Sequence, residues 1–204
     1  MKAQLTTLSA LLALAATPMA AHAIVYQFNA SLSPSNELHV PTSTASGVAT
    51  LFFDTSSNTY DFSMAVFGLS GGGSGKAASG AHIHGAASLT ENGPVRIDLL
   101  LAPFSSLNSG AILLVGGNTV AAAAIPATPA SGSNIGYGAM SFLQMLQTGL
   151  AYVNVHTTAD GAGAVRGQLV QVAAVVPEPS TYLLLLAGLG VVGMVARRRA
   201  AAAS

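Results

Sequence analysis

The sequence predicts an all-β domain, an antiparallel Greek-key sandwich or barrel, flanked by two apolar chain ends. Three observations support this fold class. Short stretches with period-two alternation or β-branched residues recur along residues 24–176. Clusters of Gly, Ser, Asn and Pro separate these stretches. Only residues 140–148 have the pattern of a short helix, ended by Gly149, so the several helices of a parallel α/β fold are missing.

Each strand is expected from its own pattern. Residues 24–32 form the first, and residues 47–54 and 59–67 pair as a hairpin, because apolar and polar side chains alternate from residue 60 to 66. The intervening segment, DTSSN at 54–58, has turn chemistry. Further strands are expected at residues 81–84, 95–101, 151–156 and 164–172. Residues 110–136 are rich in Ala, Gly and Pro and predict an irregular excursion with one strand at 111–115.

The charge of the central domain limits its partners. It carries six acidic and three basic side chains, a net charge of −3, whereas the whole chain is neutral because of its basic tail. This low charge predicts no nucleic-acid partner. The chain has no cysteine, which excludes thiolate metal sites and cysteine nucleophiles.

A glycine-rich segment at residues 68–80 contains Gly75-Lys76 but does not form a phosphate-binding loop. That loop needs a glycine where this chain has Ser70, and a Ser or Thr where it has Ala77. The segment is expected to be a flexible connection.

The N-terminal 23 residues have the pattern of a secretory signal peptide. A lysine precedes the apolar stretch 5–16, and Ala21-His22-Ala23 is a small-x-small cleavage site, with Ala21 and Ala23 as the recognised residues. An uncleaved membrane anchor is the alternative. The pattern predicts export of the domain.

The last 28 residues, 177–204, predict a membrane-anchored sorting segment. Pro177-Glu178-Pro179 precedes an apolar helix expected at about 181–196, and Arg197-Arg198-Arg199 follows it. Fifteen apolar residues rise about 22 Å, short of a roughly 30 Å hydrocarbon core, so snorkelling arginines would assist the span. Basic residues mark the cytoplasmic side, which puts the domain on the periplasmic side of the inner membrane. A buried C-terminal helix is the alternative.

This order of residues resembles the PEP-CTERM sorting signal of bacterial surface proteins. The resemblance implies an exosortase-type processing protease as partner, a final location at the cell surface or outside it, and an association with exopolysaccharide and biofilm.

Three histidines are the candidate metal ligands. In AHIHG (81–85), His82 and His84 lie on one face of a strand, and in YVNVHT (152–157) His156 shares a face with Asn154. If the two strands are neighbours, the three imidazoles converge and suit copper or zinc. The alternative is structural: each histidine donates to a loop carbonyl and stabilises a turn. On that interpretation the protein has no cofactor. Arg166 is expected to pair with Asp98 or Asp160, and His39 to lie on a solvated loop.

The same motifs resemble the CHRD domain, a family named from chordin and common in bacterial exported proteins. The resemblance runs over most of residues 26–170 and is carried by FNASLS (28–33), NE (36–37), GVA (47–49), AHIHG (81–85), GPV (93–95), YVNVHT (152–157) and GAVRGQL (163–169). The segment LHVP at 38–41 departs from the family's proline-rich pattern. The family supplies no enzymatic residues that transfer to this chain.

A second likeness is to Cu/Zn superoxide dismutase, whose Greek-key barrel carries an H-x-H pair, a later histidine and an arginine in the order of His82, His84, His156 and Arg166. The cysteines, the bridging histidine and the zinc loop of that family are absent here. The fold is therefore expected to be immunoglobulin-like or superoxide dismutase-like.

The sequence thus predicts an exported, non-enzymatic surface or matrix protein with a CHRD-like β domain. The alternative is a copper- or zinc-binding domain that uses the three-histidine face, including a copper-dependent oxidoreductase.

Overall fold

The structure is a computed structural model that describes residues 24–69, 71, 73–109, 111–122, 124–175, 188, 189 and 199. The side chains of residues 105–107, 113–115, 118 and 173–175 are outside the description. Residues Ile24–Pro177 form one compact unit. The predicted signal peptide, its cleavage site and almost all of the predicted sorting segment lie outside the described residues.

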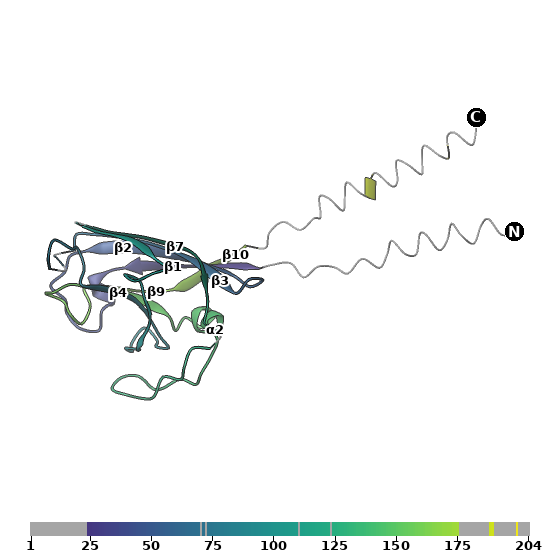
Figure 1. Ribbon diagram of the computed structural model, residues 1–204. Helices are drawn as coiled ribbons and strands as arrows, with labels where there is room; N and C mark the ends of the chain where they lie inside the picture. The colour runs from purple at the N-terminus through teal and green to yellow at the C-terminus, as the bar shows by residue number, and fades with distance from the viewer. Residues whose placement is uncertain are drawn as a thin grey trace. The chain divides into compact units, whose positions relative to one another are not determined.

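The unit consists of two antiparallel sheets (Figure 1). The larger has the strand order β10 (Val170–Val175), β1 (Val25–Leu32), β2 (Ser46–Asp54), β3 (Thr59–Phe67), β7 (Ala111–Val120) and β6 (Ser105–Ser109). The smaller has the order β5 (Val95–Asp98), β4 (Gly80–His84), β8 (Tyr152–His156) and β9 (Val165–Gln168). A 3-10 turn, η2 (Pro34–Asn36), and a short helix, α2 (Phe142–Gln147), lie in the connections. The all-β prediction is confirmed.

One hydrophobic core joins the two sheets. Phe28 and Phe62 from the larger sheet and Ile83 and Val153 from the smaller sheet belong to the same buried cluster. The described strands form two separate open sheets, so the barrel alternative is wrong and the sandwich alternative describes the fold. The sheets stay open because β10 and β6 end one ladder and β5 and β9 end the other.

The predicted hairpin is confirmed in place and register. Strands β2 and β3 pair from Ser46 with Phe67 to Asp54 with Thr59. The turn forms because Asp54 Oδ1 accepts a hydrogen bond from the Ser56 backbone N–H at 2.7 Å. Helix α2 also lies where it was expected, capped by the Ser141 side chain and followed by Gly149 at φ 68°.

The expected strand at 164–172 is wrong as a single element. It divides into β9 and β10, which belong to different sheets. Leu169 makes the division: its side chain is fully buried and its N–H donates to the Ala151 carbonyl at 2.9 Å. The expected strand at 95–101 is shorter for a local reason, since Asp98 Oδ1 accepts from the Leu100 N–H at 2.9 Å and begins a turn.

The region between β5 and α2 contains more strand than predicted. Strand β6 was missed, and β7 runs to Val120 rather than 115 because it pairs along the length of β3. The glycine-rich connection is anchored rather than free at its end: the Ala77 and Ala78 N–H groups both donate to Asn108 Oδ1 at 2.8 Å.

None of the described helices is long and apolar enough to cross a membrane. Of the predicted membrane segment at 181–196, only Gly188 and Leu189 are described.

Candidate metal centre

Strands β4 and β8 are hydrogen-bonded neighbours, as the metal hypothesis required. Their register sets His84 opposite Tyr152, His82 opposite Asn154, and Gly80 opposite His156. The intervening Ile83, Val153 and Val155 are fully buried in the core. Period-two alternation therefore places all three histidines on the other face of the smaller sheet.

The three imidazoles converge on one point. One nitrogen of each of His82, His84 and His156 lies within 4.8 Å of the corresponding nitrogens of the other two. The ring centroids of His82 and His156 are 5.0 Å apart, and those of His82 and His84 are 5.5 Å apart. Since zinc or copper binds imidazole nitrogen at about 2.0–2.1 Å, a small closure of the side chains would bring all three onto one ion.

Backbone carbonyls orient two of the rings. The Nδ1 of His84 lies 2.9 Å from the Gly93 oxygen, and the Nδ1 of His156 lies 3.1 Å from the Gly161 oxygen. A carbonyl only accepts, so each Nδ1 must carry the proton and each Nε2 must hold a free lone pair. Metal-binding histidines are usually oriented by this kind of hydrogen bond.

The free nitrogens have no partner in the protein. His84 Nε2, His156 Nε2 and His82 Nδ1 are buried and make no hydrogen bond. Leaving a buried polar atom unsatisfied costs about 1–3 kcal/mol, so three such nitrogens on neighbouring rings favour a bound ligand.

Burial also keeps the rings in the form that binds metal. The pKa of His84 is lowered to about 4, mainly by desolvation and with smaller contributions from the neighbouring histidines and Arg166, while the hydrogen bond to Gly93 raises it. Desolvation likewise lowers the pKa of His156 and of His82, where the Asp98 carboxylate acts in the opposite direction. The imidazoles are neutral near pH 7 as a result, and no proton has to leave before a metal binds.

Tyr152 and Arg166 form the layer beside His84. The rings of His84 and Tyr152 stack at 4.9 Å with planes 12° apart, and the Arg166 guanidinium lies 3.6 Å from the Tyr152 ring centroid. Arg166 is buried and donates to Asn92 Oδ1, Ser88 O and Glu91 O. Its predicted pairing with Asp98 or Asp160 is wrong, because the loop between β4 and β5 supplies these oxygens instead.

Three polar residues of this region were not singled out from the sequence. Tyr152 and Asn154 share the histidine face of β8, as the alternation of YVNVH predicts, but they were assigned no role and both are buried. Glu37 reaches the region from the connection between β1 and β2, and nothing local in the sequence shows that its side chain is buried. His39 is 39 % exposed, and its Nδ1 lies 4.0 Å from Glu37 Oε2, so it is solvated as predicted but paired with an acid.

The predicted sorting residues Pro177, Glu178, Pro179, Arg197 and Arg198 lie outside the described residues, and Arg199 is described only as exposed. The structure therefore gives no geometry for the processing step.

Comparison with known families agrees with both sequence resemblances. The PEP-CTERM protein-sorting motif matches residues 175–199. This motif implies export, processing by an exosortase and sorting to the cell envelope or surface. No curated protein and no solved structure matches the chain, so the choice between an immunoglobulin-like and a superoxide dismutase-like topology stays a prediction.

The model of the CHRD domain matches residues 28–169, which include nearly all of the described unit and all three converging histidines. The chain belongs to the CHRD domain family.

Proposed function

We propose that the CHRD domain of this exported protein binds one transition-metal ion, copper or zinc, through His82, His84 and His156, without catalysis. The observation that carries the proposal is the convergence of three imidazoles, each of which also has a buried nitrogen without a hydrogen-bond partner. Three neutral nitrogen donors suit these two metals, and copper is favoured over zinc in the general order of affinities.

The structural alternative explains only one of the two ring nitrogens of His84 and of His156. Turn stabilisation accounts for the Nδ1 contacts of His84 and His156 with Gly93 and Gly161. It does not account for the Nε2 atoms of the same two rings, which are buried and make no hydrogen bond. Ordered water at this point is the remaining competitor, and it differs from a metal in having no affinity that a chelator removes.

A non-catalytic role is proposed for an electrostatic reason. Steering of an anionic substrate such as superoxide requires accessible positive charge near the metal. The domain has a net charge of −3, and Arg166 is 1 % exposed and bound to three oxygens of the protein. Copper-dependent redox chemistry remains the second candidate, favoured only by the three-histidine donor set. A place in an exopolysaccharide matrix is supported only by the sorting motif.

The test is a calorimetric titration of the purified protein with Cu²⁺ and Zn²⁺. We expect stoichiometric binding with a Kd below about 1 μM, equivalent to about 8 kcal/mol. His84→Ala and His156→Ala should each abolish it, whereas His39→Ala, which removes a histidine outside the cluster, should not. The proposal fails if the wild type binds neither ion stoichiometrically, or if binding survives both cluster variants.

A further inference from the structure

A second polar cluster lies next to the histidine site and is organised around Glu37. This residue belongs to the connection between β1 and β2, residues 33–45, which is attached to the smaller sheet at several points. Ser33 exchanges backbone hydrogen bonds with Arg166 on β9, at 3.0 and 3.2 Å. Asp160, in the loop between β8 and β9, accepts through Oδ1 from the Thr42 N–H at 2.7 Å. The connection and this loop are therefore held together.

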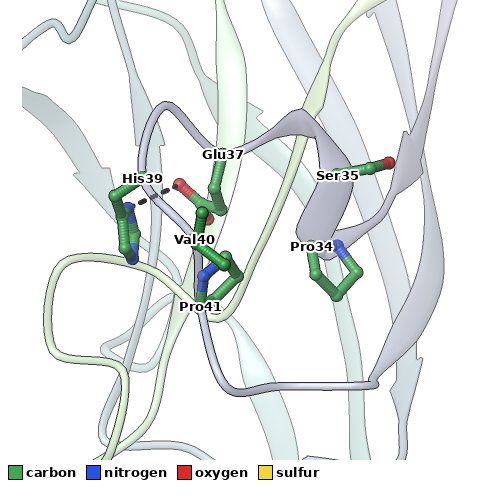
Figure 2. Close-up of a pocket in the computed structure, with 6 residues that line it drawn as sticks. All are labelled: Pro34, Ser35, Glu37, His39, Val40 and Pro41. Carbon is green, nitrogen blue, oxygen red and sulfur yellow. Dashed lines mark ion pairs between the residues drawn. The ribbon is translucent and has the colours of Figure 1, made fainter.

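Glu37 directs its carboxyl into this junction. It lines a pocket of about 300 Å³, and Figure 2 shows its Oε2 facing His39 on the solvent side. Its side chain is only 2 % exposed. The other oxygen, Oε1, is buried without a hydrogen-bond partner, and so is Oδ1 of Asn154, which is 3 % exposed.

The two unpartnered oxygens both lie close to Gly163. A Cβ placed on Gly163 would overlap Glu37 Oε1 and lie 2.7 Å from Asn154 Oδ1, so the absence of a side chain at this residue, with φ 143°, is what admits both. An ionised carboxylate and an amide oxygen are both acceptors and cannot bond to each other. A neutral carboxylic acid has the O–H that joins them.

The charges that face Glu37 agree with a bound proton. Arg166 lies on β9, Asp160 in the loop after β8, Tyr152 on β8, and His39 on the connection itself. Burial raises the pKa of Glu37 to about 7; Arg166 lowers it and Asp160 raises it. The lowering of the Glu37 pKa by Arg166 is opposed by Asp160 and does not offset the raising by burial.

We infer that Glu37 is a protonated positioning residue, whose O–H donates to Asn154 Oδ1 and holds the loop between β8 and β9 in the conformation that orients His156. Its link to metal binding rests on the proposed function. Gly163 donates its N–H to the Asp160 carbonyl at 3.1 Å, and Gly161 of the same loop supplies the oxygen that binds His156 Nδ1. Asn154 is two residues from His156 on the same face of β8 and lies opposite His82.

The competing arrangement is an ionised Glu37 that accepts from the Asn154 amide group. The two arrangements differ in the protonation of one carboxyl, which ¹³C NMR of the Glu37 side chain measures in the metal-free protein. We expect a titration midpoint near 7. A midpoint at or below 4.5, the ordinary value for glutamate, would overturn the inference whether or not the protein binds metal.

The coupling to the site is measured as metal affinity in wild type and Glu37→Gln, because glutamine keeps a donor at every pH. With Zn²⁺ as the probe, the two proteins should bind alike at pH 6, and Glu37→Gln should bind severalfold more tightly at pH 8. Glu37→Ala should bind more weakly than Glu37→Gln at both pH values, and Asp54→Asn, which removes a carboxylate in the turn between β2 and β3 but keeps its Oδ1 acceptor, should follow the wild type. Equal affinities of wild type and Glu37→Gln at pH 8 would contradict the coupling.

If no variant binds metal, the proposed function fails separately. The positioning role is then tested by ¹⁵N NMR of His156, whose Nδ1–H tautomer should persist to pH 8 in Glu37→Gln and lose population in the wild type. A tautomer population that is the same in both proteins at pH 8 would overturn it.

Discussion

The two faces of the smaller sheet use the same strands for opposite purposes. On one face, Ile83, Val153 and Val155 are fully buried and belong to the common core. On the other face, Tyr152, Asn154 and Arg166 are 1–3 % exposed, although they are polar. The alternation of residue types on these strands therefore distinguishes a face with buried apolar side chains from a face with buried polar side chains. It does not distinguish a buried face from an exposed one. Loops cover the polar face, and the buried atoms that make no hydrogen bond there include the histidine nitrogens, Glu37 Oε1 and Asn154 Oδ1.

The apolar face should be the more sensitive to truncation. Ile83→Ala removes buried methyl groups between two rigid sheets, and we expect a loss of about 3 kcal/mol in the free energy of unfolding. Urea denaturation of the metal-free protein measures it. Ile83→Val should lose about 1 kcal/mol, and a loss below that in Ile83→Ala would show that the sheets close over the cavity.

The polar face should gain stability only when a metal is present. At a free Zn²⁺ or Cu²⁺ concentration of about 100 times Kd, the wild type should gain about 2.7 kcal/mol. His84→Ala should gain nothing, while Ile83→Val should still gain most of it. Thermal denaturation with and without a chelator gives both values, and an equal gain in His84→Ala would assign the effect to another site.

The pH dependence of the unfolding free energy should also distinguish the polar face from the apolar face. The folded pKa of His84 is about 4, below its ordinary value of 6.5, so the folded state resists protonation longer than the unfolded state. Its contribution is fully present above pH 6.5 and is lost as pH falls toward 4, by at most about 1.4 kcal/mol per pH unit. The difference in unfolding free energy between wild type and His84→Phe should therefore change across this window, whereas the difference for Ile83→Val should be flat.

Glu37 should act in the opposite direction. Its folded pKa of about 7 lies above the ordinary 4.5, so its contribution is greatest below pH 4.5 and is lost as pH rises to 7. Unfolding of Glu37→Gln between pH 4.5 and 7 should show a steeper rise in stability with pH than the wild type. A slope identical to that of the wild type would show that Glu37 does not have a raised pKa in the folded protein.

The smallest effect is expected at His39, outside both faces. Its side chain is exposed, and its Nδ1 lies 4.0 Å from Glu37 Oε2. His39→Ala should change the unfolding free energy by less than about 0.5 kcal/mol and leave metal affinity unchanged. A large effect on metal affinity would mean that the Glu37 pocket and the histidine site are more tightly coupled than the contacts indicate.

The accuracy of the sequence-based expectations follows the range of the interactions concerned. The hairpin of β2 and β3 was predictable because its alternation and its Asp54 turn are local. Strand β6 was missed because its pairing with β7 is decided by the partner strand. The break at Leu169 was missed because the residue is apolar within an apolar run, and only its hydrogen bond to Ala151 shows that the chain changes sheets.

The sequence by itself determined the strand period, the shared face of His82 and His84, the absence of thiol chemistry, and the sorting motif at the C-terminal end. These depend on covalent order and on the two-residue repeat of an extended chain. The tertiary structure alone decided that β8 pairs with β4, that Arg166 binds the 88–92 loop, and that Glu37 and Asn154, more than 100 residues apart in the chain, both lie close to Gly163. Such contacts result from the packing of two sheets and their loops, and burial then sets the protonation of the groups they enclose.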